Sequence, residues 1–246
     1  MDRFIAGQRR NLDQLRQTQL FQDLIDSLDR AYRSVIEMVP ELGPPIIYGR
    51  FVLVCHKSML SAATLIGQGQ PEDAGGVTRR AVEAARVALA IKLNDENAAQ
   101  WVAYEDRHDR WLRRLQNERP RSFRVEFRDI RGHAVIERLD AHLGTLSDGV
   151  VHFTPEFYIG LDWEVREAAG SAAEVYLNYF QRDNRAIELA LISLSAMHLT
   201  ILEAFDACYD GRLQADGACQ QALVDFIQFG RASIAAYQQR YRTAEG

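Results

Sequence analysis

Three charged residues fall on one face of a segment that otherwise has the pattern of a buried helix. Arg79, Glu83 and Arg86 are spaced i, i+4 and i+7, so a helix presents all three side chains on one face. The residues around them are mostly alanine, valine, leucine and isoleucine, which leaves little room for a wide solvated face. Charges on such a helix are costly unless they pair. The pattern indicates either salt bridges that fix the helix register or a functional site.

A later segment carries polar side chains that would complete such a site. Ser147, Asp148, His152 and Thr154 lie within residues 144–155, which we interpret as a loop between two helices, and they could meet the charged stripe in a cleft. A histidine close to arginine and glutamate can titrate near neutral pH and act as an acid or a base. The alternative is that Asp148 or Thr154 caps the next helix and that His152 bonds a backbone carbonyl. The functional hypothesis assigns catalysis to His152, Arg79 and Glu83, and ligand binding to Arg86, Asp148 and Thr154.

Two further spacings that include a histidine match only part of a known catalytic or metal-binding motif. Glu105 and His108 have the Glu-x-x-His spacing of di-metal carboxylate sites, but such sites need the motif twice and it is found once. Arg128 and His133 have the Arg-x-x-x-x-His spacing of HEPN-type helical ribonucleases, in which the histidine moves a proton from the RNA 2′-hydroxyl and the arginine stabilises the phosphate. The sequence has no phosphate-binding glycine loop, nucleophile elbow or zinc-ligand cluster, so we predict no metal and no cofactor.

Other candidate residues favour structural roles. His56 and His198 lie in apolar helical patterns, and we expect them to be core histidines with satisfied hydrogen bonds. We expect His142 to lie at the surface. The aromatic residues of the last predicted helix are expected to form core or a dimer face rather than a ligand site. They are Phe226, Phe229, Tyr237 and Tyr241.

Composition limits the classes of partner. The net charge of −5 gives no reason to expect strong general attraction to nucleic acid, although arginines cluster within residues 111–124. Three cysteines without a Cys-x-x-Cys pair favour a reducing, cytoplasmic location. The N-terminus lacks the apolar core of a signal peptide. The longest uncharged apolar stretch, residues 189–202, is shorter than the roughly 20 residues of a membrane span, so we expect a buried central helix and no membrane.

The apolar period is near 3.6 residues along most of the chain, which predicts an all-α protein. We expect a multi-helix bundle of about 7–9 helices connected as up-down hairpins, forming a single domain over residues 1–246. Residues 116–130 are predicted to be a loop with a short extended piece at 123–127. The predicted helices are 12–39, 47–66, 71–93, 96–115, 132–143, 162–181, 184–209 and 216–242.

Three of these segments together resemble a bacterial family of helical proteins that is considered related to HEPN-like bundles. They are the turn at residues 65–74, the Arg79-x-x-x-Glu83 helix and the later element Leu146-Ser-Asp-Gly-Val-Val-His152. The resemblance covers about residues 50–155 and implies a helical-bundle fold, with Arg79, Glu83 and His152 as the family's polar positions. The family has no settled activity, so the resemblance implies a fold more than a function.

Three functions remain open from the sequence. The first is a non-enzymatic bundle that binds a partner, either RNA or protein, or forms a homo-oligomer. The second is a HEPN-like, metal-independent ribonuclease of a toxin or phage-defence system. The third is binding of a small anionic ligand by the arginines at 79 and 86. Convergence of Arg79, Glu83 and His152 in an open cleft favours the ribonuclease, whereas pairing of the charges within the bundle favours a structural role.

Overall fold

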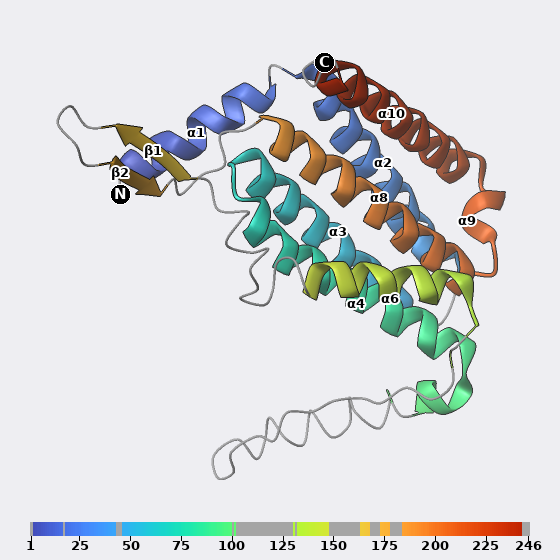
Figure 1. The fold of residues 1–246 in the computed structure, drawn as a ribbon. Coiled ribbons are helices and arrows are strands. Elements are labelled where there is room, and N and C mark those ends of the chain that lie inside the picture. The colour runs from blue at the N-terminus through green and yellow to red at the C-terminus, as the bar shows by residue number, and fades with distance from the viewer. Residues whose placement is uncertain are drawn as a thin grey trace, which may run out of the picture.

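The computed structural model is a bundle of long helices (Figure 1), which confirms the predicted all-α fold class. It describes residues 2–16, 18–42, 46–99, 101, 130, 132–147, 163–167, 173–177 and 184–242. Residues 95–99 and 101 are also helical and continue the chain beyond the fourth helix. The helices are α1 (Asp2–Arg16), α2 (Gln19–Leu42), α3 (Ile46–Gly67), α4 (Pro71–Leu93), α6 (Ala134–Leu146), α8 (Asn184–Cys208), α9 (Arg212–Ala215) and α10 (Gly217–Arg242).

Helices α3 and α4 form a hairpin whose turn is set by local sequence. Gly69 has φ +81°, a left-handed conformation that glycine adopts without steric cost, and its N–H donates to the carbonyl of Ile66 (2.9 Å). Pro71 then opens α4, where its missing N–H is no loss. Glu72 and Asp73 follow in the first turn, where the helix dipole favours negative charge. The predicted helices at 47–66 and 71–93 are therefore confirmed within one residue at each end.

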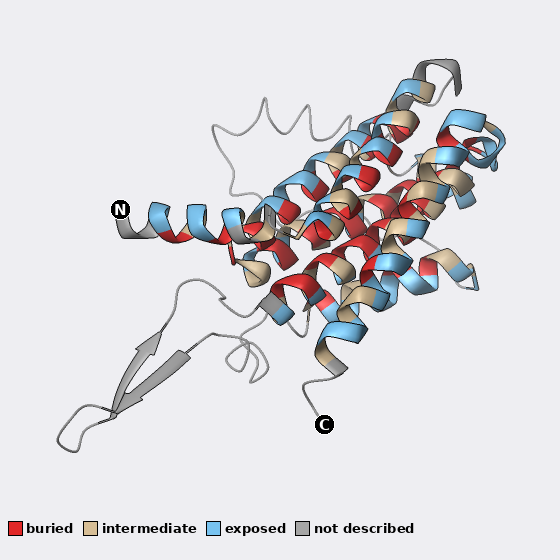
Figure 2. Ribbon diagram, turned by 90° about the horizontal axis from the view of Figure 1, so that it is seen from above, coloured by how far each residue is buried: buried red, intermediate tan, exposed pale blue. Residues whose placement is uncertain are grey.

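Helix α4 lies at the centre of the bundle and packs against α3, α8 and α6. The buried faces of the helices point toward this shared interior (Figure 2). The buried positions of α4 are mostly small, which allows the neighbouring helices to approach closely. They are Ala74, Gly75, Thr78, Ala81, Val82, Ala85, Ala88, Leu89, Ala90 and Ile91.

Helix α8 is long and apolar. Its segment Arg185–Cys208 is long and apolar enough to cross a membrane, judged by length and composition alone. In the bundle 56% of its most apolar window is buried, including Leu191, Leu194 and Ile201. This agrees with the prediction of a buried central helix at 189–202, which α8 extends at both ends.

The prediction of one helix over residues 12–39 was wrong, because the chain breaks it into α1 and α2. The carbonyl of Thr18 accepts hydrogen bonds from the N–H groups of Phe21 (3.0 Å) and Gln22 (3.3 Å), so a new helix begins there. The apolar stripe of the amphipathic pattern starts only at Phe21, and the sequence upstream of it follows a different face.

The predicted helix at 162–181 was also wrong where the structure describes it. Strands β1 (Trp163–Glu167) and β2 (Ala173–Leu177) pair antiparallel there, with Trp163 opposite Leu177 and Val165 opposite Val175. The sequence Trp-Glu-Val-Arg-Glu alternates apolar and charged residues, a period of 2 that favours a strand over a helix. The predicted loop at 116–129 and most of the predicted helix at 96–115 lie outside the described residues.

Two glycines inside long helices give a matched prediction for stability. An added Cβ at Gly230 in α10 lies 3.9 Å from Leu24 Cδ1, an ordinary contact, whereas at Gly49 in α3 it lies 2.7 Å from Val39 Cγ1. We expect Gly230→Ala to raise the free energy of unfolding by about 0.5–1 kcal/mol through reduced backbone entropy of the unfolded chain. We expect Gly49→Ala to lower it by about 1–3 kcal/mol, because the stiff valine cannot move away easily. Urea unfolding at neutral pH measures both, and equal effects of the two substitutions would contradict the packing described.

Candidate functional site

The three charged residues of α4 lie along the seam between α4 and α6. Arg79 Nε donates to Glu83 Oε1 (2.9 Å), and Arg79 Nη1 donates to the hydroxyl of Ser147 at the end of α6. Arg86 Nε forms an ion pair with Asp140 in the middle of α6. The side chains of Arg79, Glu83 and Arg86 are 29%, 51% and 30% exposed, so the stripe lies at the edge of the packed interface. Its charges are used in contacts within and between helices.

Helix α6 is held by polar contacts on its other flank as well. Arg138 forms an ion pair with Glu203 of α8, and His142 Nε2 lies 3.1 Å from Thr200 Oγ1 of the same helix. Burial, aided by the charge of Arg138, lowers the pKa of His142 below its ordinary value. His142 is half-buried rather than at the surface as predicted, because α8 covers one side of the ring. Between the two polar flanks, α6 buries the apolar side chains of Ile136, Leu139 and Leu146.

The stripe reaches the residue from which the predicted loop continues. Ser147 donates to the carbonyl of Leu143 (2.7 Å) while it accepts the hydrogen bond from Arg79. The loop residues that the sequence singled out, Asp148, His152 and Thr154, lie outside the described residues. Their convergence with Arg79 and Glu83 therefore stays a prediction.

The two weaker histidine motifs are only partly described. His133 precedes the first residue of α6 and takes the N-cap position without a side-chain cap. Its Nδ1 is buried and has no hydrogen-bond partner among the described residues. Arg128, Glu105 and His108 lie outside the described part of the chain, so both motifs stay predictions.

A cluster of titratable groups lies in the core between α2, α3 and α8. The Tyr32 hydroxyl is 2.6 Å from His198 Nδ1, and both side chains are fully buried. Burial raises the pKa of Tyr32 and lowers the pKa of His198 to about 3, so both groups are neutral at physiological pH. Within the described part of the molecule His198 Nε2 has no hydrogen-bond partner. The prediction that His198 is a core residue is right, but only one of its two ring nitrogens is satisfied.

The second core histidine connects this pair to the surface. The ring of His56 stacks on Tyr32 with a centroid distance of 5.3 Å and an interplanar angle of 17°. His56 Nε2 lies 2.6 Å from Asp29 Oδ1, and Arg33 pairs with the other oxygen of Asp29 at the same distance. Burial acts to raise the pKa of Asp29, but hydrogen bonds from His56 and Arg33 outweigh it, and the pKa lies below its ordinary value. His56 meets Tyr32 by ring stacking, an arrangement that packs the core and leaves the buried His198 out of reach of a substrate.

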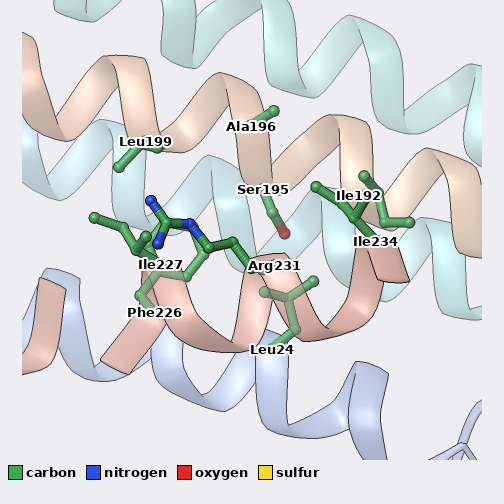
Figure 3. A pocket seen from close by; sticks show the side chains of 10 residues that line it. Leu24, Ile192, Ser195, Ala196, Leu199, Phe226, Ile227, Arg231 and Ile234 are labelled. Atoms are coloured by element: carbon green, nitrogen blue, oxygen red, sulfur yellow. The ribbon is translucent and has the colours of Figure 1, made fainter. Parts of the chain in front are cut away.

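An apolar groove opens between α8 and α10, with Leu24 of α2 in its lining (Figure 3). Its volume is about 230 Å³. The Ser195 hydroxyl in the groove donates to the carbonyl of Leu191 (2.8 Å), so its hydrogen is already used. Arg231 is exposed at the rim and forms no ion pair or hydrogen bond with any described residue. The lining residues are Leu24, Ile192, Ser195, Ala196, Leu199, Phe226, Ile227, Gly230, Arg231 and Ile234.

The groove is the feature that sequence reasoning missed. Phe226 was expected to be core or dimer face, and it is buried at the groove. A signal was present, because Ile192, Ala196 and Leu199 follow helical spacing on α8, and Ile227 and Ile234 do so on α10. Both stripes match an ordinary core pattern. That the two helices leave space between them is a matter of packing.

Comparison of the chain with protein-family models, with curated proteins and with solved structures gives no match. Over the described residues, no group of three or more His, Cys, Asp or Glu side chains is arranged to hold a metal ion.

The buried His198 predicts how stability depends on pH. Its pKa is about 3 in the folded protein and 6.5 when exposed, so between these values the unfolded chain binds a proton that the folded protein does not. We expect the free energy of unfolding to fall as the pH decreases from about 6.5 toward 3, and His198→Asn to weaken this dependence. Urea unfolding at pH 7 and pH 5 measures the effect.

The control for that experiment is His142→Gln, which removes a half-buried histidine whose pKa is shifted in the same direction. We expect it to change the pH dependence less than His198→Asn does. An unchanged pH dependence in His198→Asn would show that His198 is protonated in the folded protein or that the folded protein opens around it.

Proposed function

We propose that this protein is a non-enzymatic binding module whose binding site is the groove between α8 and α10. The observation that carries the proposal is an open, apolar concavity between α8 and α10, lined by nine uncharged residues and one arginine. Ile234 at its edge is 41% exposed, so a ligand in the groove can cover apolar surface there. Apolar pockets with one or two polar groups are the usual form of binding sites for apolar ligands or side chains.

The state of the charged stripe supports the same proposal. A catalytic or anion-binding role for Arg79 and Arg86 requires guanidinium groups that are available to a substrate. Both are engaged, Arg79 with Glu83 and Ser147 and Arg86 with Asp140. The stripe therefore acts as a set of contacts that position α6, and the groove is a surface that these contacts do not use.

Binding at the groove is tested with an uncharged apolar fluorophore, Nile red. We expect its fluorescence to increase with the wild-type protein and to lose most of that increase with Ala196→Trp, because the indole fills the groove from an exposed position. Ala141→Trp, at an exposed position on α6 outside the groove, is the matched control and should bind the dye as the wild type does. Equal dye binding by both variants would contradict the proposal.

One observation favours a second candidate, a HEPN-like ribonuclease. The hydrogen bond from Arg79 to Ser147 anchors the start of the segment that contains His152, five residues further along the chain. An arginine beside a histidine is the pairing that such metal-independent RNA cleavage uses, with the histidine moving the proton of the 2′-hydroxyl.

RNA cleavage in the presence of a chelator separates the two candidates. The binding-module proposal expects no cleavage above background by the wild-type protein, and no change in His152→Ala or His133→Ala. Gel analysis of a labelled single-stranded RNA is the measurement. Cleavage by the wild type that disappears in one of these variants, with thermal unfolding unchanged, would establish the ribonuclease and identify which histidine it uses.

A further inference from the structure

We infer that the groove between α8 and α10 binds a soluble, single-chain amphiphile, with its apolar chain in the groove and an anionic head group on Arg231. This inference rests on the proposed function and names the chemistry of the ligand. The anion is thus expected to bind Arg231 rather than Arg79 and Arg86, because the guanidinium groups of Arg79 and Arg86 are already paired.

The dimensions of the groove favour one chain of moderate length. It extends along α8 from Ile192 to Leu199 and along α10 from Phe226 to Ile234, which at about 1.5 Å per residue is about 10–12 Å. Its volume of about 230 Å³ lies below the roughly 300 Å³ at which pockets for drug-sized ligands begin. A linear chain suits this shape, because its contacts follow the two helices.

Arg231 supplies the only charge among the lining residues. Figure 3 shows its guanidinium reaching over the groove toward the end where Leu199 and Ile227 lie. The neighbouring lining groups offer no carboxylate, and the hydroxyl hydrogen of Ser195 is already donated to Leu191. The guanidinium over the groove therefore has hydrogen-bond donors that no lining side chain accepts.

A ligand that carries its own anion supplies an acceptor for these donors. A carboxylate or phosphate accepts two parallel hydrogen bonds from the planar guanidinium, a charge-assisted pairing stronger than a neutral hydrogen bond. The chain then covers the apolar residues that are otherwise exposed, Ile234 among them. Affinity and orientation thus come from different parts of one ligand, which is how sites with apolar walls and a few polar groups achieve specificity.

The test uses decanoate and 1-decanol, two ligands with the same chain and different heads, with binding measured by titration calorimetry. We expect decanoate to bind the wild type more tightly than decanol does, and Arg231→Gln to weaken decanoate binding by about tenfold without changing decanol binding. Ala196→Trp should abolish binding of both. Arg80→Gln removes another exposed arginine with no partner among the described residues, on α4, and should change neither.

Three results would overturn the inference. Equal affinities of decanoate and decanol, unchanged by Arg231→Gln, would show that the groove is an apolar site without a contact to the head group. The proposed function would still stand if Ala196→Trp abolishes Nile red binding. A wild-type dimer that Ala196→Trp converts to a monomer, without decanoate binding, would assign the groove to a second copy of the chain. Sedimentation with anionic phospholipid vesicles that depends on Arg231, without decanoate binding, would assign it to a membrane surface.

Discussion

The burial of α4 on three sides is the constraint on which the rest of the structure depends. Its alanines allow α3, α8 and α6 to pack closely around it, so its charged residues are confined to positions outside these packed faces. Arg79, Glu83 and Arg86 lie at the seam with α6, where Arg79 meets Ser147 and Arg86 meets Asp140. Partly exposed ion pairs contribute about 0–1 kcal/mol each, so these contacts set the register of α6 more than they stabilise the bundle.

A second constraint is the polar pair in the core. Tyr32 and His198 share one hydrogen bond, and whichever of them donates, one polar atom of the pair is left without a partner among the described residues. Protonation of His198 would add a charge to this apolar surrounding, which is why its pKa is so low. The pair costs stability compared with an apolar pair of similar shape, and it ties α2 to α8 at one defined position.

The groove follows from how α10 is attached. Helix α10 packs mainly against α2 and only lightly against α8. Near the end of the chain it is tied to α8 by the ion pair between Arg240 and Glu188 and by the hydrogen bond from Arg185 to Tyr237 (3.3 Å). Along the middle, Gly230 and Ala196 are too small to fill the space between the helices. The apolar lining and the unpaired Arg231 are therefore open to a ligand, in contrast to the paired arginines of α4.

Local sequence determined the helices, because hydrophobic periodicity and helix-terminal residues act over a few neighbouring positions. It was sufficient for α3, α4, α8 and α10 and for the shared face of Arg79, Glu83 and Arg86. It failed at 163–177, where a period of 2 competes with a helical pattern, and at the break before α2. Tertiary structure alone decided that Arg86 meets Asp140 and that Ile192 faces a gap beside Ile234. Arg86 and Asp140 are 54 residues apart in the sequence, and Ile192 and Ile234 are 42 apart. Only the packing of the helices brings the first pair into contact and leaves a gap beside the second.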